Sequence, residues 1–300
     1  MHCAARSRAV ARAMLHAPTM RRLLIINATV ALLAACGGAD PANPDAGPTL
    51  DAGSDDYHAD RVGYVNVIEG GAFLSVFAAI ADGPERPLPA ATAVDGECAV
   101  YRRPAPALCQ PACDGVCEAP GVCRPWAQAV DVGTITVTGL KQPLAFVRGG
   151  FGYEPTPAPG TADLFDAGDP IAITAPGAAI GGFDVALTGV ADLTAATQNL
   201  TLSDGQPAEV TWAAAGSGRV QLALLVGWHG APWEAMLLCE TADDGALTIP
   251  GALVTALPHA SSGLESHTST ITRFARKSVL APAGVIEFVV GSQRPIYFTR

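Results

Sequence analysis

The sequence predicts an all-β fold of the β-sandwich type, and three observations support that class. From Arg61 onward, apolar and polar residues alternate with a period of two, which is typical of strands with one buried face. Glycine-rich turn sequences separate these stretches at intervals of about 8 to 12 residues. Only 250–257, which begins with a proline, has the features of a helix. Many short strands with so little helix are typical of a β-sandwich.

The first segment of the chain, 1–35, is a predicted export signal. Arg21 and Arg22 precede an apolar stretch at 23–33, interrupted only by Asn27 and Thr29. Eleven residues are too few to span a bilayer as a helix, which needs about 20. The sequence therefore predicts a cleaved signal peptide, and the position of Met20 directly before the arginines makes it a candidate for the true translation start.

The apolar stretch ends in the motif Leu33-Ala34-Ala35-Cys36. This motif resembles the lipobox of bacterial lipoproteins. The resemblance implies cleavage before Cys36 and lipidation of Cys36. It also implies sorting to the outer membrane, because the residue after the lipidated cysteine is Gly37 and not an aspartate. The alternative is an ordinary signal peptide with a chance cysteine.

The next segment, 36–60, is rich in Ala, Asp, Gly and Pro and contains almost no bulky apolar residues. Such a segment cannot bury enough surface to offset its ordering entropy, so we expect a disordered acidic tether. Its aspartates do not follow the spacing of an EF-hand loop, which argues against a calcium site.

Charge excludes several classes of partner. The chain has 18 Lys+Arg and 28 Asp+Glu; five of the basic residues and none of the acidic ones precede Cys36, so the net charge from Cys36 onward is −15. Phosphate backbones and anionic lipid surfaces would repel such a chain. We expect no nucleic-acid partner, and membrane association through the lipid anchor on Cys36.

The strands are predicted within a single domain, 61–300. Clear alternation marks 134–138, 183–188 and 220–228. Weaker signals lie at 61–68, 74–81, 171–174, 209–212, 235–241, 266–275 and 285–290. A division into a small N-terminal β unit and a second sandwich from about residue 130 is the alternative, but a lone hairpin at 61–81 would be only marginally stable.

Six cysteines follow the lipobox and predict disulfides, because thiols pair in an oxidising compartment. They are Cys98, Cys109, Cys113, Cys117, Cys123 and Cys239. Fifteen complete pairings are possible. Five of the six lie in a cysteine-rich insertion, 98–126, so full pairing requires one bridge from the insertion to Cys239. Cys98 is the favoured partner of Cys239, because it stands outside the tight run of four cysteines at 109–123. A zinc or iron–sulfur site in that run is the competing interpretation.

The second half of the domain resembles an immunoglobulin-like sandwich in architecture only. Immunoglobulin domains carry a Cys, a Trp and a second Cys at sandwich spacing. Trp212 and Cys239 supply the last two, but no cysteine precedes Trp212 on a nearby strand. The resemblance implies two packed antiparallel sheets and no particular activity.

No catalytic or metal-binding constellation is apparent, and we expect no cofactor. The histidines lack ligands at metal spacing, and Ser261-Ser262-Gly263 does not match a nucleophile elbow. Four glutamates in predicted strands or adjoining loops could in principle supply paired carboxylates for a glycosidase, although exposed strand positions explain them equally well. They are Glu234, Glu240, Glu265 and Glu287.

One aromatic stretch is a candidate contact for a ligand. Trp228, His229 and Trp233 are predicted at a hairpin tip, and exposed aromatic residues on loops often contact sugars or proteins. Alternatively, both tryptophans pack back onto the edge of the sandwich.

Two function classes remain open on the sequence alone. The first is a non-catalytic, lipid-anchored envelope protein that acts as a binding or structural module for a protein or glycan. The second is an extracellular hydrolase acting on polysaccharide or peptide, which requires at least two acidic or histidine side chains that converge in a cleft.

Overall fold

The computed structural model describes residues 49–300 except 59, 71–73, 85–87, 105–108, 151, 195, 217, 228–232 and 260–268. The predicted all-β class is confirmed in this part of the chain, where strands account for nearly all regular structure and α1 (Gly251–Ala256) is the single helix. The predicted signal peptide, the lipobox with Cys36, and the residues Trp228 and His229 lie outside the described residues.

One continuous sheet of fifteen strands contains most of the fold. Along its main path the strands are β12 (Gly181–Thr188), β11 (Pro170–Gly177), β8 (Ile135–Thr138), β9 (Leu144–Gly149), β10 (Gly152–Thr156), β3 (Ser75–Ile80), β2 (Gly63–Glu69), β19 (Gly284–Thr299), β18 (Ser269–Ala281), β15 (Arg219–Gly227), β16 (Trp233–Ala242), β5 (Cys98–Arg102) and β4 (Ala91–Asp95). β1 (Asp51–Ala52) also pairs with β18, and β13 (Asn199–Thr201) with β19. Two separate two-stranded sheets are β14 (Ala208–Thr211) with β17 (Ala246–Ile249) and the hairpin of β6 (Val116–Ala119) with β7 (Val122–Arg124).

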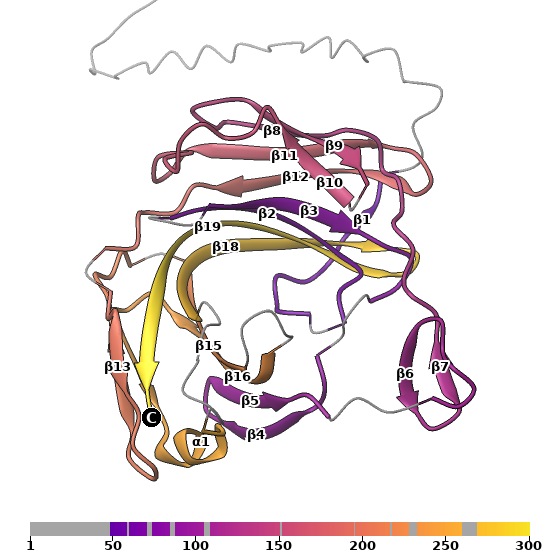
Figure 1. Cartoon of the computed structure of the whole chain (residues 1–300). Helices are drawn as coiled ribbons and strands as arrows, with labels where there is room; N and C mark the ends of the chain where they lie inside the picture. Colours follow the sequence, from indigo (N-terminus) through magenta and orange to yellow (C-terminus); the bar gives the residue numbers. More distant parts are fainter. Residues whose placement is uncertain are drawn as a thin grey trace, which may run out of the picture. The chain divides into compact units, whose positions relative to one another are not determined.

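The sheet folds over to form a first lobe with two layers. Strands β8, β9, β11 and β12 lie over β2, β3 and parts of β18 and β19 (Figure 1). Alternate residues of each strand enter the core between the layers, as Val65 and Val67 do on β2, because successive side chains of a strand point to opposite faces. Phe183 and Phe288 meet edge to face in this core, with ring centroids 4.8 Å apart.

The segment directly before Arg61 is attached to the first lobe rather than free. Asp51 pairs with Leu280 on β18, and the Leu50 N–H donates to the Gly182 carbonyl on β12 at 2.7 Å. The expected tether, 36–60, is therefore corrected for 49–58, where backbone hydrogen bonds to neighbouring strand edges offset the ordering entropy that the composition alone could not.

A second lobe has a core of its own. Strands β15, β16, β5 and β4, with the other ends of β18 and β19, pack against α1, β13, β14 and β17. Leu253 and Val254 of α1 and the Cys98–Cys239 disulfide are buried there. Cys98 and Cys239 are direct cross-strand partners on β5 and β16, the pairing that the cysteine count favoured.

The remaining cysteines cross-link the β6–β7 hairpin. The structure joins Cys109 to Cys117 and Cys113 to Cys123, so the tight run closes internally and its thiols are not metal ligands. The insertion is thus a small cross-linked hairpin, in which disulfides replace a hydrophobic core.

Strands β18 and β19 run through both lobes, and both curve strongly between them (Figure 1). Ile271 of β18 belongs to the second core and Val279 to the first. This strand path differs from the two separate sheets of an immunoglobulin domain. The structure supports the all-β class, and the immunoglobulin-like arrangement is not specifically seen.

Candidate functional site

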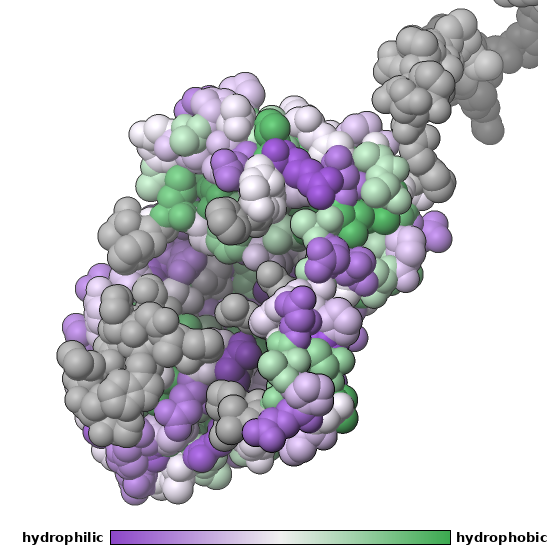
Figure 2. Space-filling view, turned by 45° about the vertical axis from the view of Figure 1, so that its right-hand side comes forward, coloured by the Kyte–Doolittle hydropathy of each residue, from purple (hydrophilic) through white to green (hydrophobic). Residues whose placement is uncertain are grey.

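The face of the curved sheet that points away from both cores forms a groove between the lobes, which we call the inner groove. It has a cavity volume of about 240 Å³. Its lining comes from five neighbouring strands and the segment before β2, namely Tyr57, Arg61, Asn66, Ile68, Gln221, Ala223, Met236, Leu238, Thr270, Thr272, Phe274, Arg276, Val289 and Gln293. Figure 2 shows this side of the molecule hollowed between its upper and lower parts, with hydrophilic side chains inside the hollow.

A row of polar side chains crosses the floor of the inner groove. Gln293 of β19 pairs with Thr272 of β18, Thr272 with Gln221 of β15, and Gln221 with Glu240 of β16. Neighbouring strands lie about 4.8 Å apart, so these side chains stand at regular intervals across the sheet. Asn66 of β2 lines the same groove, one strand beyond β19. Within the described part of the chain, no hydrogen bond engages the side chains of Asn66, Gln293 or Thr272.

Apolar side chains lie next to this row. Ile68 and Phe274 lie on either side of Gly291, which is itself buried, and the Arg276 guanidinium lies 4.5 Å from the centroid of the Phe274 ring. Met236 and Leu238 of β16 continue the apolar surface toward the second lobe. The groove therefore combines apolar side chains with amide and hydroxyl groups that have no hydrogen bond among the described residues, a combination typical of ligand sites.

The charged groups of the inner groove are paired with one another. Arg276 makes a bidentate ion pair with Glu240, at 2.5 and 3.1 Å, and Gln221 donates to the same carboxylate at 2.6 Å. Arg61 forms an ion pair with the fully buried Glu287. Two of the four glutamates considered as catalytic carboxylates are thus each held in an ion pair with an arginine.

Tyr57 and Arg61, from the segment before β2, form one wall of the inner groove. The His58 N–H donates to Glu287 at 2.8 Å, and the Ser278 hydroxyl donates to the Ser54 carbonyl. The Tyr57 ring lies under the guanidinium groups of both Arg61 and Arg276, at 5.8 and 5.3 Å. Burial raises the pKa of Tyr57 to about 12, although Arg61 partly opposes that shift.

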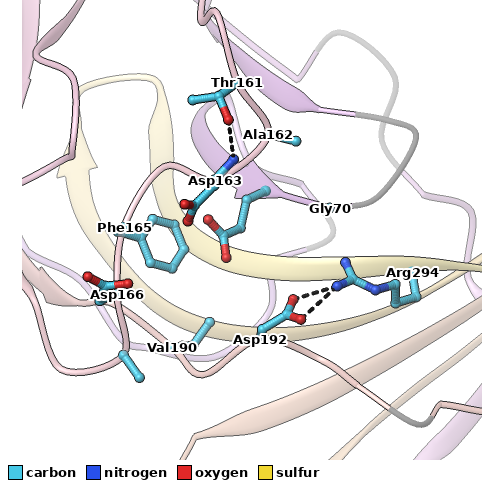
Figure 3. Close-up of a pocket in the computed structure, with 11 residues that line it drawn as sticks. Gly70, Thr161, Ala162, Asp163, Phe165, Asp166, Val190, Asp192 and Arg294 are labelled. Atoms are coloured by element: carbon cyan, nitrogen blue, oxygen red, sulfur yellow. Dashed lines mark hydrogen bonds and ion pairs between the residues drawn. The ribbon is translucent and has the colours of Figure 1, made fainter.

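A second hollow, which we call the acidic pocket, lies at one end of the first lobe and has a volume of about 450 Å³. Figure 3 shows Asp163, Asp166 and Asp192 at this pocket, with Arg294 directed at Asp192. Arg294 makes two hydrogen bonds to that carboxylate, at 2.6 and 2.8 Å. Lys141 bridges Asp163 and Asp166, and these hydrogen bonds raise the pKa of its ammonium group.

Glu69 is the buried carboxylate of the acidic pocket. It is 6% exposed and accepts a hydrogen bond from the Leu164 N–H at 2.8 Å. Burial raises the pKa of Glu69, against the effect of the backbone donors, and no ion pair joins it to a cation among the described residues. Across the described ranges, no group of three or more His, Cys, Asp or Glu side chains is placed to hold a metal ion.

The structure places some of the predicted site residues and not others. Trp233 is half-buried, with the Arg103 guanidinium 4.1 Å from its ring centroid, so this indole packs onto a neighbouring strand end. Glu234 is exposed and Glu265 lies outside the described residues. The inner groove has no signature in the sequence, because the residues that line it come from strands far apart in the chain and show no local motif.

In the ranges that the structure describes, no helix is long and apolar enough to cross a membrane. The disulfides are typical of an oxidising compartment outside the cytoplasm. A comparison with protein-family models finds no match, and a comparison with curated proteins finds none either.

Proposed function

We propose that the chain is a non-catalytic binding module of the cell envelope, anchored by a lipid on Cys36, with the inner groove as its ligand site. The observation that carries this proposal is the chemistry of the groove. Its two carboxylates are fixed by arginines, whereas the amides of Asn66 and Gln293 have no hydrogen bond among the described residues. Groups of this kind recognise a ligand without reacting with it.

The hydrolase alternative has less support. A glycosidase needs one carboxylic acid and one carboxylate on either side of the scissile bond. Glu240 and Glu287 are each occupied by an arginine and by a further N–H donor, Gln221 and His58 respectively. A hydrolase that used either residue would first have to break an ion pair.

The anchor is supported by the lipobox motif at 33–36. The disulfides agree with export. Lipidation at Cys36 and an outer-membrane position are part of the proposal.

Fractionation of the native host cells tests the anchor. We expect the full chain to enter the detergent phase of a Triton X-114 partition, and its mature mass to correspond to a start at Cys36 plus acyl chains. Cys36→Ser should move the protein to the aqueous phase, whereas the matched control Cys3→Ser should change nothing because residue 3 precedes the cleavage site. An aqueous wild-type protein, or a mature chain that retains residues before Cys36, would overturn the anchor.

A further inference from the structure

We infer that the inner groove binds a neutral saccharide, recognised through side-chain amides and hydroxyls above an apolar floor. This inference rests on the proposed function and deepens it, because it names the class of ligand. It follows from the charges, the hydrogen-bonding groups and the size of the groove.

The charges of the groove point to an uncharged ligand. The chain from Cys36 onward is strongly acidic, but the charged residues of the groove form two ion pairs, Arg61 with Glu287 and Arg276 with Glu240. A cationic ligand would meet arginines that already satisfy the carboxylates, and an anionic ligand would have to displace those carboxylates. A neutral ligand can enter without disturbing either pair.

The hydrogen-bonding groups point to hydroxyls on that ligand. Asn66 and Gln293 each offer an N–H donor and a carbonyl acceptor, and Thr270 and Thr272 each offer a hydroxyl. A sugar hydroxyl is also both donor and acceptor, so it can satisfy either kind of group. A purely apolar ligand would bury these amides without partners, which is costly.

The apolar floor matches the other half of a sugar. Ile68, Met236 and Leu238 line the groove beside the polar row, and the Phe274 ring lies under the Arg276 guanidinium at 4.5 Å. The C–H face of a pyranose can lie on such a surface while its hydroxyls reach the amides. The volume of about 240 Å³ equals roughly eight water volumes, enough to hold one ring of a short oligosaccharide whose other rings extend outside the cavity.

Calorimetry on the detergent-solubilised full chain tests the inference. The probes are neutral trisaccharides of glucose, mannose and N-acetylglucosamine, together with cationic chitosan trimer, anionic trigalacturonate and an uncharged hexapeptide. We expect at least one neutral trisaccharide to bind, and Gln293→Ala and Asn66→Ala each to weaken it about tenfold through loss of a hydrogen-bonding group. The matched control is Gln142→Ala, an exposed amide outside the groove, which should leave the affinity unchanged.

The other outcomes overturn the inference. Binding of the charged trimers or of the hexapeptide alone would assign the groove to another ligand class. Binding of a neutral trisaccharide that Gln293→Ala and Asn66→Ala leave intact would place the sugar elsewhere, and binding of no probe would also reject the saccharide. Each variant is first checked for wild-type thermal unfolding. The fractionation of Cys36→Ser tests the lipid anchor, whereas calorimetry tests the ligand. Failure of the proposed anchor is therefore distinguishable from failure of the proposed saccharide site.

Discussion

Arg273 and Arg276 lie three residues apart on β18 and therefore face opposite sides of the same sheet. Arg273 is 1% exposed and donates to both oxygens of Asp243, and to the carbonyls of Ala191, Asp192 and Ala213. Arg276 has one carboxylate partner, Glu240, beside an open groove.

The difference shows how one curved sheet can have a structural face and a binding face. On the side of the cores, Arg273 occupies the gap where the first core ends and the second begins, and Trp212 donates its indole N–H to the same Asp243 at 2.7 Å. A charge buried there must have all its hydrogen bonds. On the groove side, several polar groups lack partners in the described residues, which a stable interior could not tolerate but a ligand site can.

The largest expected effect concerns the core side of β16, where Cys239 is bonded to Cys98. The bridge closes a separation of 141 residues, and the chain-entropy relation gives about 5 kcal/mol for a loop of that length. Cys98→Ala with Cys239→Ala should lower the free energy of unfolding in urea by up to this amount. The control is Cys109→Ala with Cys117→Ala, which opens a separation of 8 and should cost about 2.5 kcal/mol at most. A larger loss in the control would contradict this ranking.

Arg273→Met should cost about 3 to 5 kcal/mol, because it leaves the Asp243 carboxylate buried without its cation. Urea unfolding measures the change. The double variant Arg273→Met with Asp243→Leu should recover part of the loss, since it also removes the uncompensated charge. If the double variant lost more free energy of unfolding than the two single variants lose in sum, the buried pair would not be the cause.

Arg276 is also largely buried, but Arg276→Met should cost less, about 1 to 2 kcal/mol, because Glu240 retains other partners. Glu240 keeps the Gln221 amide at 2.6 Å and Arg219 at 3.8 Å as partners, and Arg219 is half exposed to solvent. The same urea titration compares it with Arg273→Met. Equal losses for the two arginines would remove the distinction between the faces.

Glu69→Gln should have a smaller effect that depends on pH. Because burial raises the pKa of Glu69, the folded state holds this proton more tightly than the unfolded chain does. Stability is therefore lost as the pH rises from the ordinary glutamate pKa through the raised value, and Gln removes that loss. Thermal unfolding should show a higher midpoint for the variant at pH 7 and no gain at pH 4, whereas a gain at both values would point to a different cause.

The smallest effect is spectroscopic. Burial raises the pKa of Tyr57 and of Tyr153 to about 12 each, so both should ionise late in an alkaline absorbance titration of the five tyrosines. Their neutral forms favour the folded state, a contribution that is lost as the pH rises through 12. Tyr57→Phe should remove one late-ionising group and leave the earlier part of the curve unchanged. Loss of an early-ionising group instead would mean that Tyr57 is not buried in the groove wall.

Local pattern predicted the strands that alternate strictly. The stretches 134–138, 183–188 and 220–228 correspond to β8, β12 and β15, and the expected helix at 250–257 corresponds to α1. Each of these elements has one buried and one exposed face, so the positions of its apolar residues in the sequence indicate which face is buried. Strands β4, β9, β10 and β13 are among those that were not predicted. The sequences of β4, β9 and β10 include charged, glycine or proline residues, and β13 has only three residues and depends on pairing with the distant β19.

The sequence by itself determined the all-β class, through the period of two, and the need for a bridge between the insertion and Cys239, through an odd number of cysteines at 98–123. The tertiary structure alone decided which polar residues meet in the inner groove. Asn66, Gln221, Thr272 and Gln293 come from four strands, and β2 reaches β19 by parallel pairing across most of the chain. Backbone hydrogen bonds between strands are not specific to sequence, so only the packing of the two cores selects the partners and the register that brings these side chains together.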